Sequence, residues 1–368
     1  MPHATTLVKL TRRVGPATVA QLNQALLAKA ATHKVLRTHK VRGDTTVVEA
    51  GVCYPTDAGL LAKAVSKLAH TIGRVQAAGG PPAPRCGTAA GPPAAAPTSS
   101  PGRCGPAPAS QTAGRRAHCR AGRLGRAGGR RRRPGGPQRP PAACPRWQPG
   151  LRQAGQAVED LETTIGRTGQ VIGQARTRLA GQVPDGATRL VSLHDPDARP
   201  IVKGRLGKPV EFGYKAQVVD NPDGVVLDYL VEVGNPADAP LLVPAIERIS
   251  QQTGRVPGPA TADRGYGEAA VDDQLHALGV ERVAIPRKGT PSAARQAHEH
   301  TRSFRRLVKW RTGSEGRISH LKQRYGWDRT LMDGIDGARI CGQGVFAHNL
   351  VKISGLLQAK QQRLAACR

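Results

Sequence analysis

The chain has 368 residues and a formal net charge of +29 at pH 7, and only 3% of its residues are aromatic. No apolar run approaches the roughly 18 residues of a membrane helix, and no apolar stretch near the N-terminus resembles a secretory signal, so we expect a cytoplasmic protein. The seven cysteines contain no Cys-x-x-Cys pair, which argues against a disulfide framework and structural zinc. The positive charge favours a polyanionic partner, first of all nucleic acid.

The first 80 residues predict a modest helix at 19–31, a strand and a second helix. Asp44 precedes the β-branched run TTVV, a strong strand signal. If that strand is central, Asp44 is a buried carboxylate that needs a metal or a cation as partner. If it is an edge strand, Asp44 lies in water. Apolar residues at helical spacing follow between Leu60 and Val75.

Residues 81–150 differ in composition from everything around them. They hold 13 Arg, 15 Pro, 12 Gly and four of the seven Cys, with no Lys, Asp or Glu. Such a segment buries too little apolar surface to offset its ordering entropy, so we expect disorder. It is either a basic linker that grips phosphate through residues 130–133 or, as we favour, a coding stretch translated out of frame. The rest of the chain keeps a charge of +16.

The second half of the chain predicts a mixed sheet covered by helices, which is an α/β domain. Strands at 210–219 and 225–233 flank the turn NPDG, and a helix with apolar residues at 241–249 follows. The segment ATADRGYG then predicts a strand that ends at Asp263, a helix at 268–278 and a strand at 282–285. Asp263 is therefore placed at the carboxyl end of a strand, where α/β proteins bind ligands, or it merely caps the next helix.

A basic helix is expected within WRTGSEGRISHLKQRYGWDR, residues 310–329. Arg311, Glu315 and Lys322 stand at offsets of zero, four and eleven, which places them on one stripe of a single helix. A carboxylate between two cations suits a metal bound beside a phosphate. An ordinary solvated ion pair is the alternative.

These segments together resemble the Asp-Asp-Glu transposases of bacterial insertion sequences, over most of the chain. DTTVVEA with YPTD is similar to the first-aspartate strand of that family, ADRGYG to the second, RTGSEGRISHLKQRYG to its Arg-Glu-Lys signature helix, and VFAHNLVKI to its closing helix. Some relatives carry a tyrosine three residues before the arginine, where this chain has Val308.

The resemblance implies a ribonuclease-H-like fold and metal-dependent cleavage and strand transfer of DNA. It assigns Asp44, Asp263 and Glu315 as catalytic residues that bind two Mg²⁺ or Mn²⁺ ions, and Arg311, Lys322 and Arg317 to DNA. The partners would be double-stranded element ends and target DNA, with no membrane, in a nucleoid-associated protein, and the pairing of two ends favours a homodimer. Asp195 is a weaker alternative for the first metal ligand, because its pairing with Asp197 beside prolines is more typical of a turn.

The expected organisation has five parts. These are an N-terminal remnant with the first catalytic strand and helix (1–80), the disordered segment (81–150), a helical insertion (151–190), the catalytic core (191–355) and a basic C-terminal tail (356–368). Because residues 1–40 lack a complete helix-turn-helix, we expect truncation at the 5′ side of the coding sequence. Three functions stay open: an active transposase, an inactive remnant that only binds DNA, and a nuclease of the same fold without strand transfer.

Overall fold

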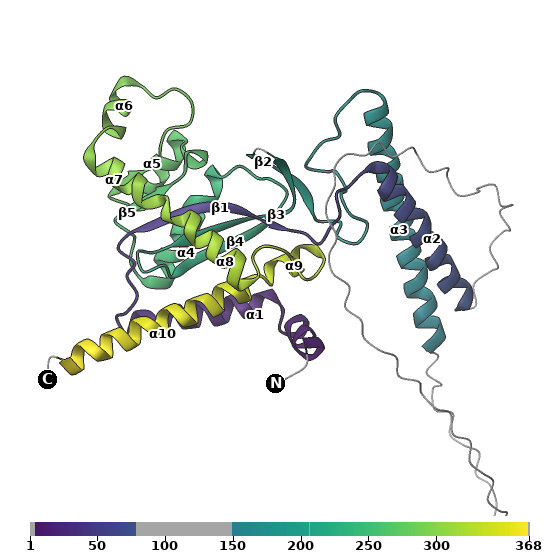
Figure 1. Cartoon of the computed structure of the whole chain (residues 1–368), viewed down its shortest axis with the longest axis horizontal. Helices are drawn as coiled ribbons and strands as arrows, with labels where there is room; N and C mark the ends of the chain where they lie inside the picture. Colours follow the sequence, from purple (N-terminus) through teal and green to yellow (C-terminus); the bar gives the residue numbers. More distant parts are fainter. Residues whose placement is uncertain (1–3, 79–148, 206, 367–368) are drawn as a thin grey trace, which may run out of the picture.

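The computed structural model describes residues 4–78, 149–205 and 207–366 (Figure 1). Almost all of the segment expected to be disordered, 81–150, lies outside the described residues. Within them, a mixed sheet carries helices on both of its faces, and two further helices extend beside it. This arrangement is consistent with the expected ribonuclease-H-like fold. Among the described helices, none is both long and apolar enough to cross a bilayer.

The centre of the sheet is strand β1 (Val41–Glu49), which contains Asp44. It pairs antiparallel with β3 (Lys208–Asp220) and parallel with β5 (Pro259–Ala262). Strands β2 (Arg199–Arg205) and β4 (Val226–Val233) both pair with β3, and β6 (Arg282–Ala284) pairs with β5. The predicted strands are confirmed, and Asp44 lies on a central strand rather than an edge strand.

Alternating side chains of the strands feed two apolar cores, one on each face of the sheet. Val219 packs in a core built with helices α1 (Ala4–Thr32), α4 (Ala239–Thr253) and α5 (Ala269–Ala277). Its neighbour Val218 points to the opposite core, under α8 (Gly313–Tyr325) and α9 (Gly334–Arg339). Because both faces are covered, most residues of β1 and β3 are buried, including polar ones such as Asp44 and Gln217. Burial of the apolar side chains contributes about 25 cal/mol per Å² to the stability of the sheet.

Two terminal helices are longer than predicted. Helix α1 extends over Ala4–Thr32 instead of 19–31, with a kink at Gly15, whose φ of 72° and ψ of 167° are not helical. Helix α10 (Gly342–Ala366) includes residues 356–366, most of the segment expected to form a basic C-terminal tail. The two helices pack side by side (Figure 1), and Asn349 donates to Asn23 across their contact. This packing gives the C-terminal segment a surface on which to stay helical.

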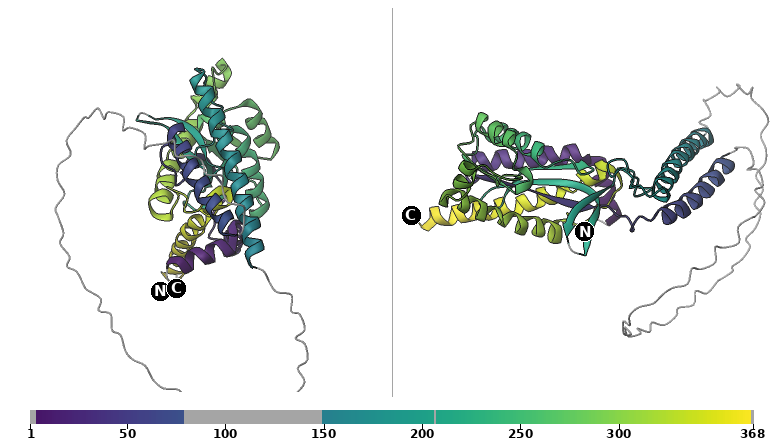
Figure 2. Two further views of the ribbon diagram at one scale, coloured as in Figure 1. Left: turned by 90° about the vertical axis from the view of Figure 1, so that its right-hand side faces the viewer. Right: turned by 90° about the horizontal axis from the view of Figure 1, so that it is seen from above.

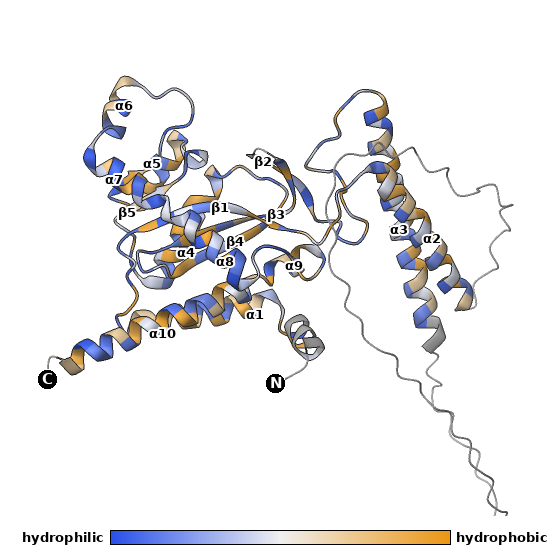
Figure 3. Ribbon diagram, in the orientation of Figure 1, coloured by the Kyte–Doolittle hydropathy of each residue, from blue (hydrophilic) through white to orange (hydrophobic). Residues whose placement is uncertain are grey.

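Helices α2 (Asp57–Ala77) and α3 (Pro149–Leu179) form a pair beside the sheet, seen in both views of Figure 2. Apolar and polar residues alternate along both helices in Figure 3. The apolar stripes meet where Ala64 and Val171 are fully buried. An ion pair of 2.7 Å between Arg74 and Asp160 bridges the exposed side. The predicted contact between the two ends of the helical insertion is thus present.

Candidate active site

The sheet register brings Asp44 and Asp263 together although 219 positions separate them in the chain. Gly43 pairs with Ala262 across the parallel strands β1 and β5, and the next residue on each strand is one of the two aspartates. Asp44 is 7% exposed. Asp263 also caps the short 3-10 turn Arg264–Tyr266 (η1), because its Oδ1 accepts from the Gly265 amide at 2.8 Å. The interpretation of Asp263 as a cap is confirmed, and its role as a site residue stays a prediction.

The short distance between the two aspartates affects the pKa of Asp44. Burial, and after it the negative charge of Asp263, raise the pKa of Asp44 from 3.8 to about 6, against the opposing effect of Arg311. Burial also raises the pKa of Asp263, with Asp238 as the next cause. The pocket disfavours the charged form of both carboxylates through burial, more strongly than the nearby Arg311 favours it. It is the kind of site in which a hard cation would be stabilised by oxygen ligands.

The predicted single helix around Glu315 is in fact two helices. Helix α7 (Arg302–Arg311) ends at Arg311, and α8 starts at Gly313 after Thr312. The guanidinium of Arg42, from β1, donates to the Trp310 carbonyl at 2.7 Å and so takes an acceptor that a continuous helix would use itself. A Cβ at position 313 would lie 2.3 Å from Arg42 Nη1, so glycine leaves the space for this side chain.

Arg311 links two of the three predicted carboxylates. Its Nη1 lies 3.1 Å from Asp44 Oδ2, and its Nη2 lies 3.4 Å from Glu315 Oε1. The Glu315 side chain is 71% exposed, whereas that of Asp44 is 10% exposed. The structure therefore brings Asp44, Asp263 and Arg311 together and leaves Glu315 at the rim. Among the described residues, no three Asp, Glu, His or Cys side chains form a group that could hold a metal ion.

The other two predicted DNA contacts lie further along α8. Arg317 Nε is 3.2 Å from Asp220 Oδ2, and its side chain is only 15% exposed. Asp220 also pairs with Arg42 at 2.7 Å, so one buried carboxylate holds both guanidinium groups. These contacts fasten α8 and the end of α7 to β1 and β3. Lys322 is half-buried in the last turn of α8. Assignment of Arg317 and Lys322 to DNA stays a prediction.

Three residues near the aspartates escaped prediction. Asp238 lies at the start of α4, and its Oδ1 is 2.7 Å from Lys215 Nζ on β3. Burial lowers the pKa of Lys203 on β2, while Asp238 is the first of the charges that raise it, and Asp44 is among them. In the sequence, Asp238 looks like a helix cap. Lys203 and Lys215 look like strand residues that face solvent. Only the sheet pairing shows that they face one site.

The alternative metal ligand, Asp195, has a structural role. It is 1% exposed, and its Oδ1 accepts from the Tyr214 hydroxyl and from the Ala198 amide at 3.3 Å. Asp197 Oδ2 accepts from the Ile335 amide at 3.0 Å at the start of α9. Both aspartates thus organise a turn and a helix start, as the proline-flanked pattern indicated.

Residues 190–346 match the family model described as the transposase DDE domain. The chain carries a transposase DDE domain. This match confirms the resemblance to insertion-sequence transposases, and it covers Asp263, Arg311 and Glu315 but not Asp44, which precedes the matched range. No curated protein and no solved structure matches the chain.

Proposed function

We propose that the chain is the transposase of an insertion sequence, which cleaves and transfers DNA strands with Asp44, Asp263 and Glu315 as catalytic residues. The observation that carries the proposal is the pairing of β1 with β5, which sets buried Asp44 and half-buried Asp263 side by side within the fold of a DDE domain. Aspartates placed by neighbouring strands are held in a fixed geometry, as a reaction on a phosphodiester requires.

The donor set fits divalent metal. Asp44 and Asp263 supply oxygen ligands in a pocket where burial disfavours carboxylate charge, and Arg311 links Glu315 to Asp44. Two Mg²⁺ or Mn²⁺ ions held there would supply an activated oxygen nucleophile and stabilise the leaving oxygen of an in-line displacement. Because the Glu315 side chain is largely exposed, it can turn inward at little cost in packing.

The chain's own residues would position the DNA. Arg311 offers a planar fork of donors beside the carboxylates, which suits a phosphate of the bound strand. Lys322 and Arg317 on α8 would contribute further phosphate contacts. The buried pair of Arg42 and Asp220 fixes the position of α7 and α8 against β1, so that Arg311 contacts Asp44. We also propose the expected setting: duplex ends and target DNA as partners, a homodimer that joins two ends, and a location at the nucleoid in the cytoplasm.

One observation favours a second candidate, an inactive remnant that binds DNA without cutting it. Arg311 occupies the space between Asp44 and Glu315, and the described residues show no group of three metal-binding side chains. In such a remnant the guanidinium would stay paired with both carboxylates permanently. In the transposase it would exchange them for a phosphate.

Nicking of supercoiled DNA separates the candidates. The transposase is expected to convert supercoiled plasmid to the open circle only when Mg²⁺ or Mn²⁺ is added, and to lose this activity in Asp44→Asn and Asp263→Asn. A remnant would bind the plasmid in a salt-dependent way and leave it uncut. A nuclease without strand transfer would cut but never join 3′-hydroxyl ends to a second DNA.

A further inference from the structure

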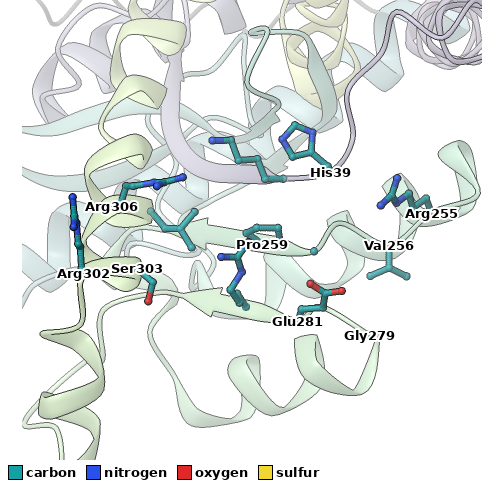
Figure 4. A pocket seen from close by; sticks show the side chains of 13 residues that line it. His39, Arg255, Val256, Pro259, Gly279, Glu281, Arg302, Ser303 and Arg306 are labelled. Carbon is teal, nitrogen blue, oxygen red and sulfur yellow. The ribbon is translucent and has the colours of Figure 1, made fainter.

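A groove of about 910 Å³ lies where α7 meets the beginnings of β1, β5 and β6. Figure 4 shows Arg302 and Arg306 of α7 at one end of it and Arg255 at the other, with Glu281 between them. The groove is separate from the pair of aspartates, which lie where β5 ends rather than where it begins. Nothing in the proposed chemistry explains why basic side chains gather there.

The groove has an excess of positive charge that the protein itself does not neutralise. Its lining contains five cationic side chains and one carboxylate, Glu281: Lys40, Arg255, Arg282, Arg302 and Arg306. Within the described part of the chain, none of these five side chains forms an ion pair. Other basic residues do, as Arg248 does with Asp228 at 2.6 Å. Gathering unpaired cations costs electrostatic energy, which an anionic ligand would recover.

Positive charge also exceeds negative charge around Lys40. Burial lowers its pKa, and the positive charge of Arg306 lowers it further. Its Nζ lies 4.4 Å from the centre of the Trp310 ring, and Arg42 Cζ lies 4.8 Å from it. Trp310 immediately precedes Arg311, so Lys40 of the groove and the aspartate site lie on either side of one aromatic residue. A ligand that spans both places would meet positive charge all along its length.

The length of α7 indicates that such a ligand carries several negative charges along an extended backbone. Arg302 and Arg311 are the first and last residues of this helix, about 14 Å apart at 1.5 Å per residue. A DNA duplex carries one negative charge per about 1.7 Å of its axis, so a duplex with a phosphate at Arg311 presents several more along α7. A single small anion would use only one or two of five spread cations.

We propose that this groove binds the phosphodiester backbone of duplex DNA that flanks the strand held at Asp44 and Asp263. The inference rests on the proposed function for the identity of the ligand. The groove supplies affinity and register without base recognition, because its lining offers charged side chains toward phosphates and little apolar or aromatic surface toward bases.

The test is the salt dependence of DNA binding by the full chain, measured by fluorescence anisotropy with a labelled duplex of arbitrary sequence in the presence of a chelator. The variant Arg302→Gln/Arg306→Gln removes two groove cations. Its matched control, Arg152→Gln/Arg176→Gln, removes two exposed arginines from α3, which Figure 1 places on the other side of the sheet from α7. Arg255→Gln/Arg282→Gln tests the opposite wall independently, and circular dichroism verifies that each variant is folded.

Each lost phosphate contact lowers the slope of log affinity against log salt by about 0.9, so each groove variant is expected to lose about 1.8. Between 50 and 200 mM salt, wild type then loses about twelvefold more affinity than the groove variant. The control is expected to keep the wild-type slope. Unchanged slopes in both groove variants, or equal losses in groove variants and control, would overturn the proposal.

The chelator separates this inference from the proposed chemistry. A changed slope together with a wild-type protein that never nicks DNA leaves the groove standing and rejects the transposase activity. Metal-dependent nicking together with unchanged slopes in both folded groove variants rejects the groove and leaves the activity standing.

Discussion

Replacing Asp44 with asparagine is expected to stabilise the metal-free protein against unfolding at neutral and alkaline pH. Burial and the charge of Asp263 raise the pKa of this carboxyl from 3.8 to about 6. The folded state therefore holds an ionised Asp44 at a cost, and this rise in pKa corresponds to about 3 kcal/mol. Asparagine has the same shape, keeps an oxygen that accepts from the Thr45 amide, and carries no charge.

The pH window follows from the sign of the shift. Since the pKa is higher in the folded state, the unfavourable contribution is absent below about pH 3.8 and complete above about pH 6. Urea unfolding in the presence of a chelator, at pH 4 and pH 8, measures it as the difference between the variant and wild type. We expect a gain of up to about 3 kcal/mol at pH 8 and almost none at pH 4.

Asp220→Asn is the matched control, because Asp220 is also a buried aspartate in the sheet, and its partners are Arg42 and Arg317. Removing one partner of a buried ion pair typically costs about 3 to 5 kcal/mol, so this variant should be destabilised. If Asp44→Asn were destabilised at pH 8 as well, the attraction between Arg311 and the Asp44 carboxylate would exceed the cost of burying that charge. The conclusion that burial raises the pKa of Asp44 by more than Arg311 lowers it would then be refuted.

Three further predictions follow from the same contacts. Glu315→Gln should abolish metal-dependent nicking and leave the affinity for a DNA duplex within about twofold, since its side chain is 71% exposed; nicking that survives the change would remove Glu315 from the site. Gly313→Ala should destabilise the fold by about 1 to 3 kcal/mol in urea unfolding, because its Cβ would meet Arg42 Nη1 at 2.3 Å, whereas Gly316→Ala on the same helix meets nothing within 4 Å and should be neutral or stabilising; equal effects would contradict the packing account. Burial lowers the pKa of His348 from 6.5 to about 4, so the folded state favours the neutral ring and loses up to about 3 kcal/mol as the pH falls from 6.5 to 4; in His348→Gln the unfolding free energy should depend less on pH over that window, and an unchanged dependence would exclude the histidine as the cause.

The sheet could be predicted from the sequence because its signals are local. The β-branched run after Asp44, the NPDG turn between β3 and β4, and the glycines after Asp263 each specify their structure within a few residues. The break between α7 and α8 was not predicted, because the Arg42 side chain that donates to the Trp310 carbonyl there comes from 268 residues away in the chain.

The residue types of the site could be predicted from the sequence, but the contacts between these residues could not. The sequence indicates that Asp44, Asp263 and Glu315 belong together only through the resemblance to a family, and it gives no sign that Arg311 contacts Asp44 as well as Glu315. Asp238 shows the same limit, since a residue at the start of a helix looks like a cap until the sheet places it near Asp263.

The most direct test of the metal site is anomalous diffraction from crystals of the protein grown or soaked with Mn²⁺. We expect an anomalous peak in contact with the carboxylates of Asp44 and Asp263, with Glu315 turned away from Arg311 and toward the ion. A well-ordered site with no peak at these aspartates, or with the Arg311 pairing intact at saturating Mn²⁺, would contradict this expectation.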